Sequence, residues 1–128
     1  MEDAIKKPTE SELEVLQVLW EFGPSTVRFI NDRLNLNKKV GYTTTLKIMQ
    51  IMTEKGILSR NTESRTHVYS SQISQDEAQQ QMLDKLLKSV FGGSAKNLVI
   101  QALGNHKSTK TELEEIKKLI RDLEGGEQ

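Results

Sequence analysis

The chain has 128 residues, a formal net charge of zero and 35% hydrophobic residues, which fits one domain or a small domain with an accessory helical segment. It contains no cysteine, and this excludes a disulfide framework, a thiolate metal site and a cysteine nucleophile. No apolar run approaches the length that spans a bilayer, and the acidic start does not resemble a signal peptide. We therefore expect a cytoplasmic protein with no membrane partner.

Charge is distributed unevenly along the chain. Residues 1–27 contain six acids and two lysines, a balance of −4, whereas residues 28–67 contain eight bases and three acids, a balance of +5. A local basic surface is the electrostatic requirement for binding a polyanion. The pattern favours nucleic acid as the partner of residues 28–67, with chance clustering of solvated charges as the alternative.

The first two predicted helices are short and amphipathic. Thr9 and Glu12 have the spacing of a capping box, so a helix is expected after Thr9, and Gly23-Pro24 ends it. Ser25 or Thr26 then caps a second helix, which a polar connector at 35–40 follows. The expected buried stripes are Leu13, Leu16, Leu19 and Trp20 in the first helix and Val27, Ile30 and Leu34 in the second.

Residues 41–56 predict a third helix with one apolar and one polar face. We expect Thr43 as its N-cap and Gly56 as the left-handed residue after its last turn. The helical period places one set of side chains inward, namely Leu46, Met49 and Met52, and another outward, namely Thr43, Lys47, Gln50 and Glu54.

A hairpin is expected next, with strands at 57–61 and 65–70 joined by a turn at 62–64. Tyr69 is expected to pack in the core with a hydrogen-bonded hydroxyl rather than to contact DNA. Three helices followed by a hairpin is the element order of a winged helix-turn-helix, in which the third helix can enter a DNA major groove. The predicted fold is therefore mainly α with a small β-hairpin wing.

Side-chain chemistry identifies candidate DNA contacts around the third helix and the wing. Short hydroxyls at the helix start can reach phosphate oxygens or base edges, and a helix N-terminus attracts phosphate. Lysine suits phosphate or guanine, and glutamine can pair with adenine. The candidate residues are Lys38, Lys39, Tyr42, Thr43, Thr44, Thr45, Lys47, Gln50, Arg60 and Arg65.

The C-terminal part predicts three more helices, at about 75–91, from Ser94 to a turn at 104–107, and after Thr109. Capping-box pairs Ser74–Glu77 and Thr109–Glu112 mark two of the starts. Residues from 125 onward should fray. We accordingly expect a winged-helix DNA-binding domain at 1–73 and a helical dimerisation domain at 74–128.

The apolar stripes of these three helices are large for so short a segment and need a partner surface. They either fold back on the first three helices or pack against a second copy of the chain. A homodimer suits DNA binding, because two linked reading helices can engage half-sites about one helical turn apart. The residues expected at the dimer surface are Leu86, Val90, Leu98, Leu103, Leu113, Ile116, Ile120 and Leu123.

Catalytic motifs are missing from the sequence. His67 and His106 lie far apart without carboxylates at ligand spacing, and neither nucleotide-binding glycine motif occurs. We expect no enzyme activity, no metal site and no cofactor. The function that we expect is that of a DNA-binding regulator, with a double-stranded DNA operator as its partner. The alternatives are a winged-helix module that binds protein, and a regulator that responds to a metal or small effector.

Several runs together resemble a known family. They are LEVLQVLW at 13–20, Thr44 with Lys55-Gly56, Arg65 with Val68-Tyr69, and FGGS at 91–94 before a leucine-rich end. Over about residues 7–123 the chain resembles the penicillinase repressor family, winged-helix repressors that include regulators of β-lactamase and methicillin-resistance genes. The resemblance implies a homodimer that represses by occupying an operator of dyad symmetry. It also implies that Thr44 is a reading-helix residue and Arg65 a wing residue.

The chain departs from the family pattern in three places. Ile51 stands where the family commonly has arginine, and Ser64 replaces the common wing glycine. In well-studied relatives a membrane-bound sensor-protease pathway has the repressor cut in its C-terminal region. The matching position, Gln101-Ala102, lacks the bulky residue found there, and this departure counts against proteolytic induction of the present chain. Copper-responsive relatives rely on a cysteine-bearing tail, which this cysteine-free chain does not have.

Overall fold

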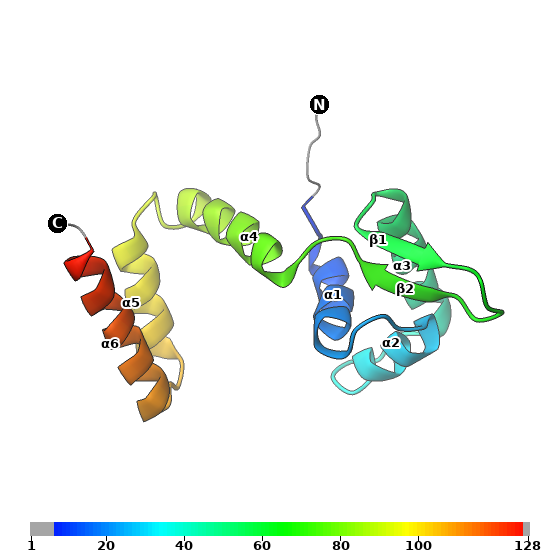
Figure 1. Cartoon of the computed structure of the whole chain (residues 1–128), viewed down its shortest axis with the longest axis horizontal. Helices are drawn as coiled ribbons and strands as arrows, with labels where there is room; N and C mark the ends of the chain where they lie inside the picture. The colour runs from blue at the N-terminus through cyan, green and yellow to red at the C-terminus, as the bar shows by residue number, and fades with distance from the viewer. Residues whose placement is uncertain (1–6, 127–128) are drawn as a thin grey trace. The chain divides into compact units, whose positions relative to one another are not determined.

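The computed structural model describes residues 7–126, which form a mainly helical chain with one small antiparallel hairpin (Figure 1). This confirms the predicted fold, three helices and a wing followed by a helical C-terminal region. The elements are α1 (Glu10–Phe22), α2 (Val27–Leu34), α3 (Tyr42–Glu54), β1 (Leu58–Asn61), β2 (Val68–Ser71), α4 (Gln75–Ser89), α5 (Ala95–Asn105) and α6 (Lys110–Gly125).

The chain forms two compact units, one ending at Asp84 and one starting at Lys85, so the division lies within α4. Helix α4 begins just after the domain boundary expected at 73/74, and that boundary stays a prediction. The first turns of α4 belong with the first unit because Ala78 is buried among its core residues. No helix in the described part of the chain is both long enough and apolar enough to cross a membrane.

Hydrogen bonds from side chains define where the first helices begin. At α1 the Thr9 hydroxyl accepts from the Glu12 amide at 3.2 Å, and the Glu12 carboxylate accepts from the Thr9 amide at 2.9 Å, which confirms the capping box. Thr26 caps α2 by accepting from the Phe29 amide at 3.1 Å. Ser25 instead pairs with β2, through two backbone bonds to Tyr69 of 2.8 and 3.0 Å.

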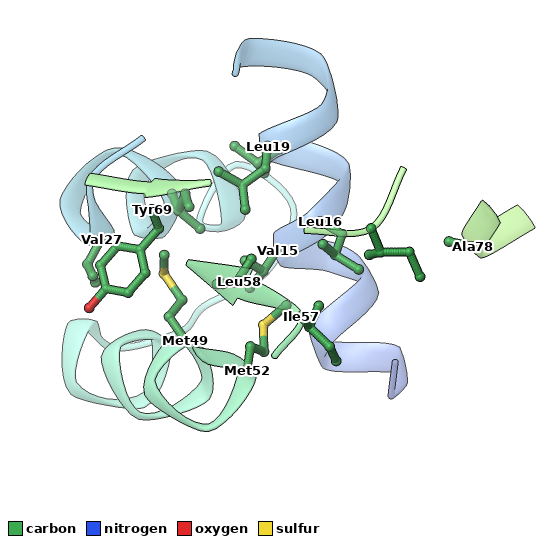
Figure 2. Packing of buried hydrophobic residues seen from close by; sticks show 13 residues of the cluster. Val15, Leu16, Leu19, Val27, Met49, Met52, Ile57, Leu58, Tyr69 and Ala78 are labelled. Carbon is green, nitrogen blue, oxygen red and sulfur yellow. The ribbon is translucent and has the colours of Figure 1, made fainter. Parts of the chain in front are cut away.

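The core of the first unit lies between α1, α2, α3 and the hairpin (Figure 2). Its fully buried side chains come from every one of these elements: Val15, Leu16, Ile30, Met49, Met52 and Tyr69. Leu46, expected inside, is only half-buried and packs at the edge of this cluster. The core therefore fixes which side of α3 faces solvent.

Polar contacts hold α3 at both of its ends. At its start, the buried Asn31 amide group donates to the Thr45 hydroxyl at 2.7 Å and to the Val40 carbonyl at 3.1 Å. At its end, the Lys55 ammonium lies 2.8 Å from the Glu12 carboxylate of α1. These contacts set the orientation of α3 against α1 and α2.

The N-cap of α3 differs from the predicted one. The helix begins at Tyr42 with Gly41 as the cap residue, and no side chain accepts from its first amides, so the assignment of Thr43 as N-cap is wrong. Gly41 already has the extended backbone that a cap requires, with φ −76° and ψ 156°, and this starts the helix two residues earlier. Gly56 does follow the last turn with φ +84°, as predicted.

The hairpin is shorter than predicted and its loop is longer. Asn61 pairs with Val68 and Leu58 with Ser71, which leaves residues 62–67 as the loop and places Arg65 there rather than in a strand. Two side-chain bonds stabilise this loop: Asn61 Oδ1 accepts from the Glu63 amide at 2.9 Å, and the Ser64 hydroxyl donates to the Thr66 carbonyl at 2.6 Å.

The second unit contains the end of α4 and the pair α5 and α6, which run in opposite directions in Figure 1. Helix α4 ends at Ser89, two residues before the prediction, and Gly92 and Gly93 follow with φ of +57° and +85°. Helix α5 includes Gly104, so the turn occupies 106–109 rather than 104–107. Helix α6 extends to Gly125; of the residues expected to fray, 127 and 128 lie outside the described part.

Candidate nucleic-acid interface

The outward face of α3 is polar at its start and middle. Tyr42, Thr43, Thr44, Lys47 and Gln50 are all exposed. These are five of the six α3 residues predicted as DNA contacts. Together they present hydroxyl, ammonium and carboxamide groups along more than two turns of one helix, which is the chemistry that reads phosphates and base edges.

Thr45 is the exception and must be removed from the candidate DNA contacts. Its side chain is fully buried, and its hydroxyl accepts the hydrogen bond from the Asn31 side chain at 2.7 Å. It lies four and seven residues before Met49 and Met52, which are fully buried on the same side of the helix. Thr45 therefore anchors α3 to α2 and cannot reach a ligand outside.

The start of α3 leaves its first backbone amides open to a ligand. Because Gly41 has no side chain, nothing in the described part of the chain caps the amides of Tyr42, Thr43 and Thr44, and the first intrahelical bond is made by Thr45 to the Gly41 carbonyl at 3.2 Å. Such an end carries partial positive charge and accommodates a phosphate oxygen.

The predicted basic residues differ in how their charge is used. Lys38 lies 2.6 Å from the Glu14 carboxylate of α1, so much of its charge is balanced within the domain. Lys39, Lys47, Arg60 and Arg65 are exposed, and none has an ion-pair partner within residues 7–126. Arg60 stands on β1 opposite Tyr69, and Arg65 stands in the wing loop.

A hollow of about 300 Å³ lies between the start of α2, the first turns of α3 and the wing loop. Two basic residues line it, Arg65 from the wing and Arg28 from α2, together with Tyr42 and Tyr69. Arg28 was not among the predicted contacts. Its guanidinium lies 5.0 Å from the centre of the Tyr42 ring, in cation–π contact. The one signal for Arg28 in the sequence was that it is among the eight basic residues of the positively charged segment 28–67.

The second unit exposes the apolar side chains that were predicted at a dimer surface. Within the described chain, α5 and α6 contain no buried residue. Six of the eight candidates are exposed, namely Leu86, Val90, Leu103, Leu113, Ile120 and Leu123, and the other two, Leu98 and Ile116, are half-buried. Val99, Ile100 and Leu119 add further exposed apolar area to the same two helices.

Comparison with known proteins agrees with this architecture. The sequence profile of the penicillinase repressor family matches residues 8–122, which include every described element except the end of α6. The chain is also similar to a penicillinase repressor from Staphylococcus aureus, with 23% identity over 113 residues that cover 88% of this chain and 90% of the relative. That family consists of DNA-binding transcriptional repressors and not of enzymes. The chain therefore belongs to the penicillinase repressor family.

Proposed function

We propose that the protein represses transcription as a homodimer that occupies a dyad-symmetric operator, with α3 of each copy in the major groove and the wing on the adjacent backbone. The observation that carries this proposal is the exposed face of α3, where uncapped amides, Thr43, Thr44, Lys47 and Gln50 lie outward without partners in the described chain. Unused polar groups on an exposed helix suit a major groove whose base edges present both hydrogen-bond acceptors and donors.

The exposed apolar surface of the second unit supports the homodimer. Side chains such as Val90, at 66% exposure, and Leu123, at 62%, would leave a large hydrophobic area in water if the chain were alone. Burial of a leucine or valine side chain contributes about 1.5–3 kcal/mol. A second copy presents the same stripe and can cover it by two-fold pairing, which also places two α3 helices on one operator.

Release of the repressor by cleavage fits the position of the Gln101–Ala102 bond. Both residues are exposed in α5, between Leu98 and Leu103, two of the proposed dimer residues. A cut there would divide the dimer surface. Immunoblots made before and after derepression of the protein's own transcription unit test this step. A fragment ending near Gln101 supports cleavage, and an intact chain after full derepression contradicts it.

The DNA-binding proposal is tested by fluorescence anisotropy on a duplex from the promoter of the protein's own transcription unit. Affinity should fall linearly with salt on logarithmic axes between roughly 50 and 200 mM, because neutralised phosphates release counterions. Lys47→Ala and Arg65→Ala should each reduce the slope by about one where the residue touches phosphate. If Lys47 contacts a base instead, its loss should relax discrimination at one position.

Lys118→Ala is the matched control, because it removes an exposed lysine on α6, in the second unit. It should leave both the affinity and the salt slope unchanged. A flat salt response of the unmodified protein, or equal affinity for the promoter and a shuffled duplex, would contradict the proposal.

A further inference from the structure

The hollow between α2, α3 and the wing contains a polar group that the fold leaves without a partner. Tyr69 is only 1% exposed, yet its hydroxyl has no hydrogen-bond partner among residues 7–126, contrary to the sequence-based expectation. The Tyr69 ring packs beside Val27, and its hydroxyl points away from Leu16 and Ile57 (Figure 2). Because Tyr69 and Val27 both line the hollow, the hydroxyl is directed into it.

Two backbone bonds fix the position of the Tyr69 backbone. Ser25 and Tyr69 exchange amide-to-carbonyl bonds of 2.8 and 3.0 Å, which tie the segment just before α2 to β2. The tyrosine is therefore held under the first turn of α2. A hydroxyl so placed cannot turn to another acceptor without breaking the core packing around its ring.

The start of α2 adds two more donors to the same hollow. Thr26 caps only the Phe29 amide, and the first intrahelical bond is made by the Ile30 amide to the Thr26 carbonyl at 3.1 Å. The amides of Val27 and Arg28, both in the lining, thus precede the first helical bond and are available to a ligand. An anion placed there would lie at the positive end of the α2 dipole, where such amides can bind it.

Charge in the hollow is of one sign. Its lining includes Arg28, Arg65 and His67 and no acidic residue. Neither arginine is ion-paired within the described chain, and the Tyr42 ring holds the Arg28 guanidinium at 5.0 Å from its centre. The ligand chemistry that fits an uncharged hydroxyl donor, two amides and two guanidiniums is a tetrahedral oxyanion.

We propose that the hollow binds one backbone phosphate of the operator in each half-site, with the Tyr69 hydroxyl and the Val27 and Arg28 amides as donors and Arg28 as the counter-charge. This proposal rests on the proposed DNA-binding function. The phosphate comes from DNA and not from a free anion because the same hollow is bounded by Tyr42 of α3 and Arg65 of the wing, the two elements that would flank the groove. Tyr69 is thereby both a core residue and a DNA contact.

The test uses the promoter duplex with single phosphates replaced, one at a time, by neutral methylphosphonates. The wild-type protein should lose about tenfold in affinity at one phosphate in each half-site, the loss expected for a charge-assisted hydrogen bond. Tyr69→Phe, which removes only the hydroxyl, should bind the unmodified duplex about tenfold more weakly and be largely insensitive to the same replacement. Arg28→Met should behave similarly.

Arg33→Met is the matched control, since Arg33 is on the same helix but lies over the Phe22 ring at 4.6 Å, outside the hollow. It should keep the full sensitivity to the replaced phosphate. Tyr69→Phe must also show the wild-type melting temperature, which separates lost contact from lost fold. If Tyr69→Phe binds as wild type, or loses equally at every replaced phosphate, the inference is overturned while DNA binding stands.

A titration with inorganic phosphate, followed by amide NMR shifts of Val27 and Arg28, separates the two sources of the anion. The proposal expects binding only at millimolar concentrations, with the shifts lost in Tyr69→Phe. Micromolar binding of free phosphate that does not compete with DNA would overturn the assignment to the operator. Failure of the wild-type protein to bind any duplex would instead overturn the proposed function itself.

Ile51 is an exposed apolar residue on α3. Its side chain is 40% exposed on α3, one turn beyond Lys47 and two turns beyond Thr44. Met49 and Met52, close to it in sequence, are fully buried and mark the inner face of α3. Ile51 does not lie on that face. An apolar side chain in a major groove finds one apolar feature there, the 5-methyl group of thymine.

We infer that Ile51 contacts a thymine methyl group in each half-site, which again rests on the proposed function. Replacing thymines one by one with uracil deletes only that methyl group. The wild-type protein should lose about three- to tenfold at one thymine per half-site, and Ile51→Ala should lose nothing further there. Leu36→Ala, a change at a 68% exposed leucine outside α3, is the control. Equal sensitivity of Ile51→Ala and wild type to every uracil would overturn the inference.

Discussion

At the residue scale, adjacent threonines of α3 lie in different environments. Thr44 is exposed on the outward face, whereas Thr45 is buried and accepts from Asn31 at 2.7 Å. The sequence alone offered three hydroxyls in a row and favoured all of them as DNA contacts. Its helical period did contain the distinguishing signal, because Thr45 precedes the inward-facing Met49 and Met52 by four and seven residues.

This division predicts opposite results for two matched substitutions. Thr45→Val keeps the shape but leaves a buried Asn31 donor with one acceptor fewer, so the free energy of unfolding should fall by about 1–3 kcal/mol. Thr44→Val should change that free energy by less than about 0.5 kcal/mol. Urea unfolding measures both values.

DNA affinity should respond the other way. Thr44→Val removes an exposed hydroxyl from the reading face and should weaken operator binding, whereas Thr45→Val should leave the salt slope of binding unchanged once the protein is fully folded. A stable Thr45→Val protein that loses operator affinity would contradict a role of Thr45 limited to the stability of the fold.

At the element scale, local patterns predicted where helices begin better than where loops end. The pairs Thr9–Glu12 and Ser74–Glu77 form reciprocal caps as expected, because both partners lie within one turn. The wing loop was predicted too short, since its length depends on pairing between Asn61 and Val68 and on bonds within the loop. Strand register is set by such longer-range contacts, which no local pattern records.

Contacts between elements were also not predictable from the sequence. The ion pair of Glu12 with Lys55 joins α1 to the end of α3 across 43 residues, and the Glu12 side chain is only 6% exposed. Glu12 therefore has two roles. The sequence indicated its role as the cap partner of Thr9, but not its role as the acceptor that holds the end of α3. The same carboxylate fixes the start of one helix and the end of another.

Glu12→Gln should consequently destabilise more than an ordinary surface change. It leaves the Lys55 ammonium, 25% exposed, without its counter-charge, and we expect a loss of about 1–3 kcal/mol in the free energy of unfolding. Glu10→Gln in the same first turn is the control, since Glu10 is exposed and should change stability by less than about 0.5 kcal/mol. Equal values for the two variants in urea unfolding would show that the ion pair contributes nothing.

At the scale of the whole molecule, the order of the elements followed from the sequence. Periodicity identified every helix, and the apolar stripes of the C-terminal helices indicated a surface that one chain does not cover. The division within α4 was not foreseen, because it depends on Ala78 joining the core of the first unit. Burial of a single small side chain leaves little trace in a hydrophobic pattern.

The proposed homodimer predicts a specific effect of charge on α6. Ile120→Asp and Leu123→Asp place a carboxylate on the apolar face, whose burial against a second copy would be unfavourable. Sedimentation velocity should show a shift from dimer to monomer. Arg121→Asp, the matched control, puts the same aspartate on the polar side of α6 and should remain a dimer. An unchanged dimer in Ile120→Asp would remove α6 from the interface.

The most direct test of the account is selection of DNA sites by the intact protein from a library of random duplexes. Two copies of α3 held by one dimer should enrich a motif of two inverted half-sites, with their centres about ten base pairs apart. Thr45→Val should select the same motif, and Lys47→Ala should select a weakened or relaxed one. Enrichment of a single asymmetric site, or of no sequence at all, would contradict a dimeric repressor that reads DNA with α3.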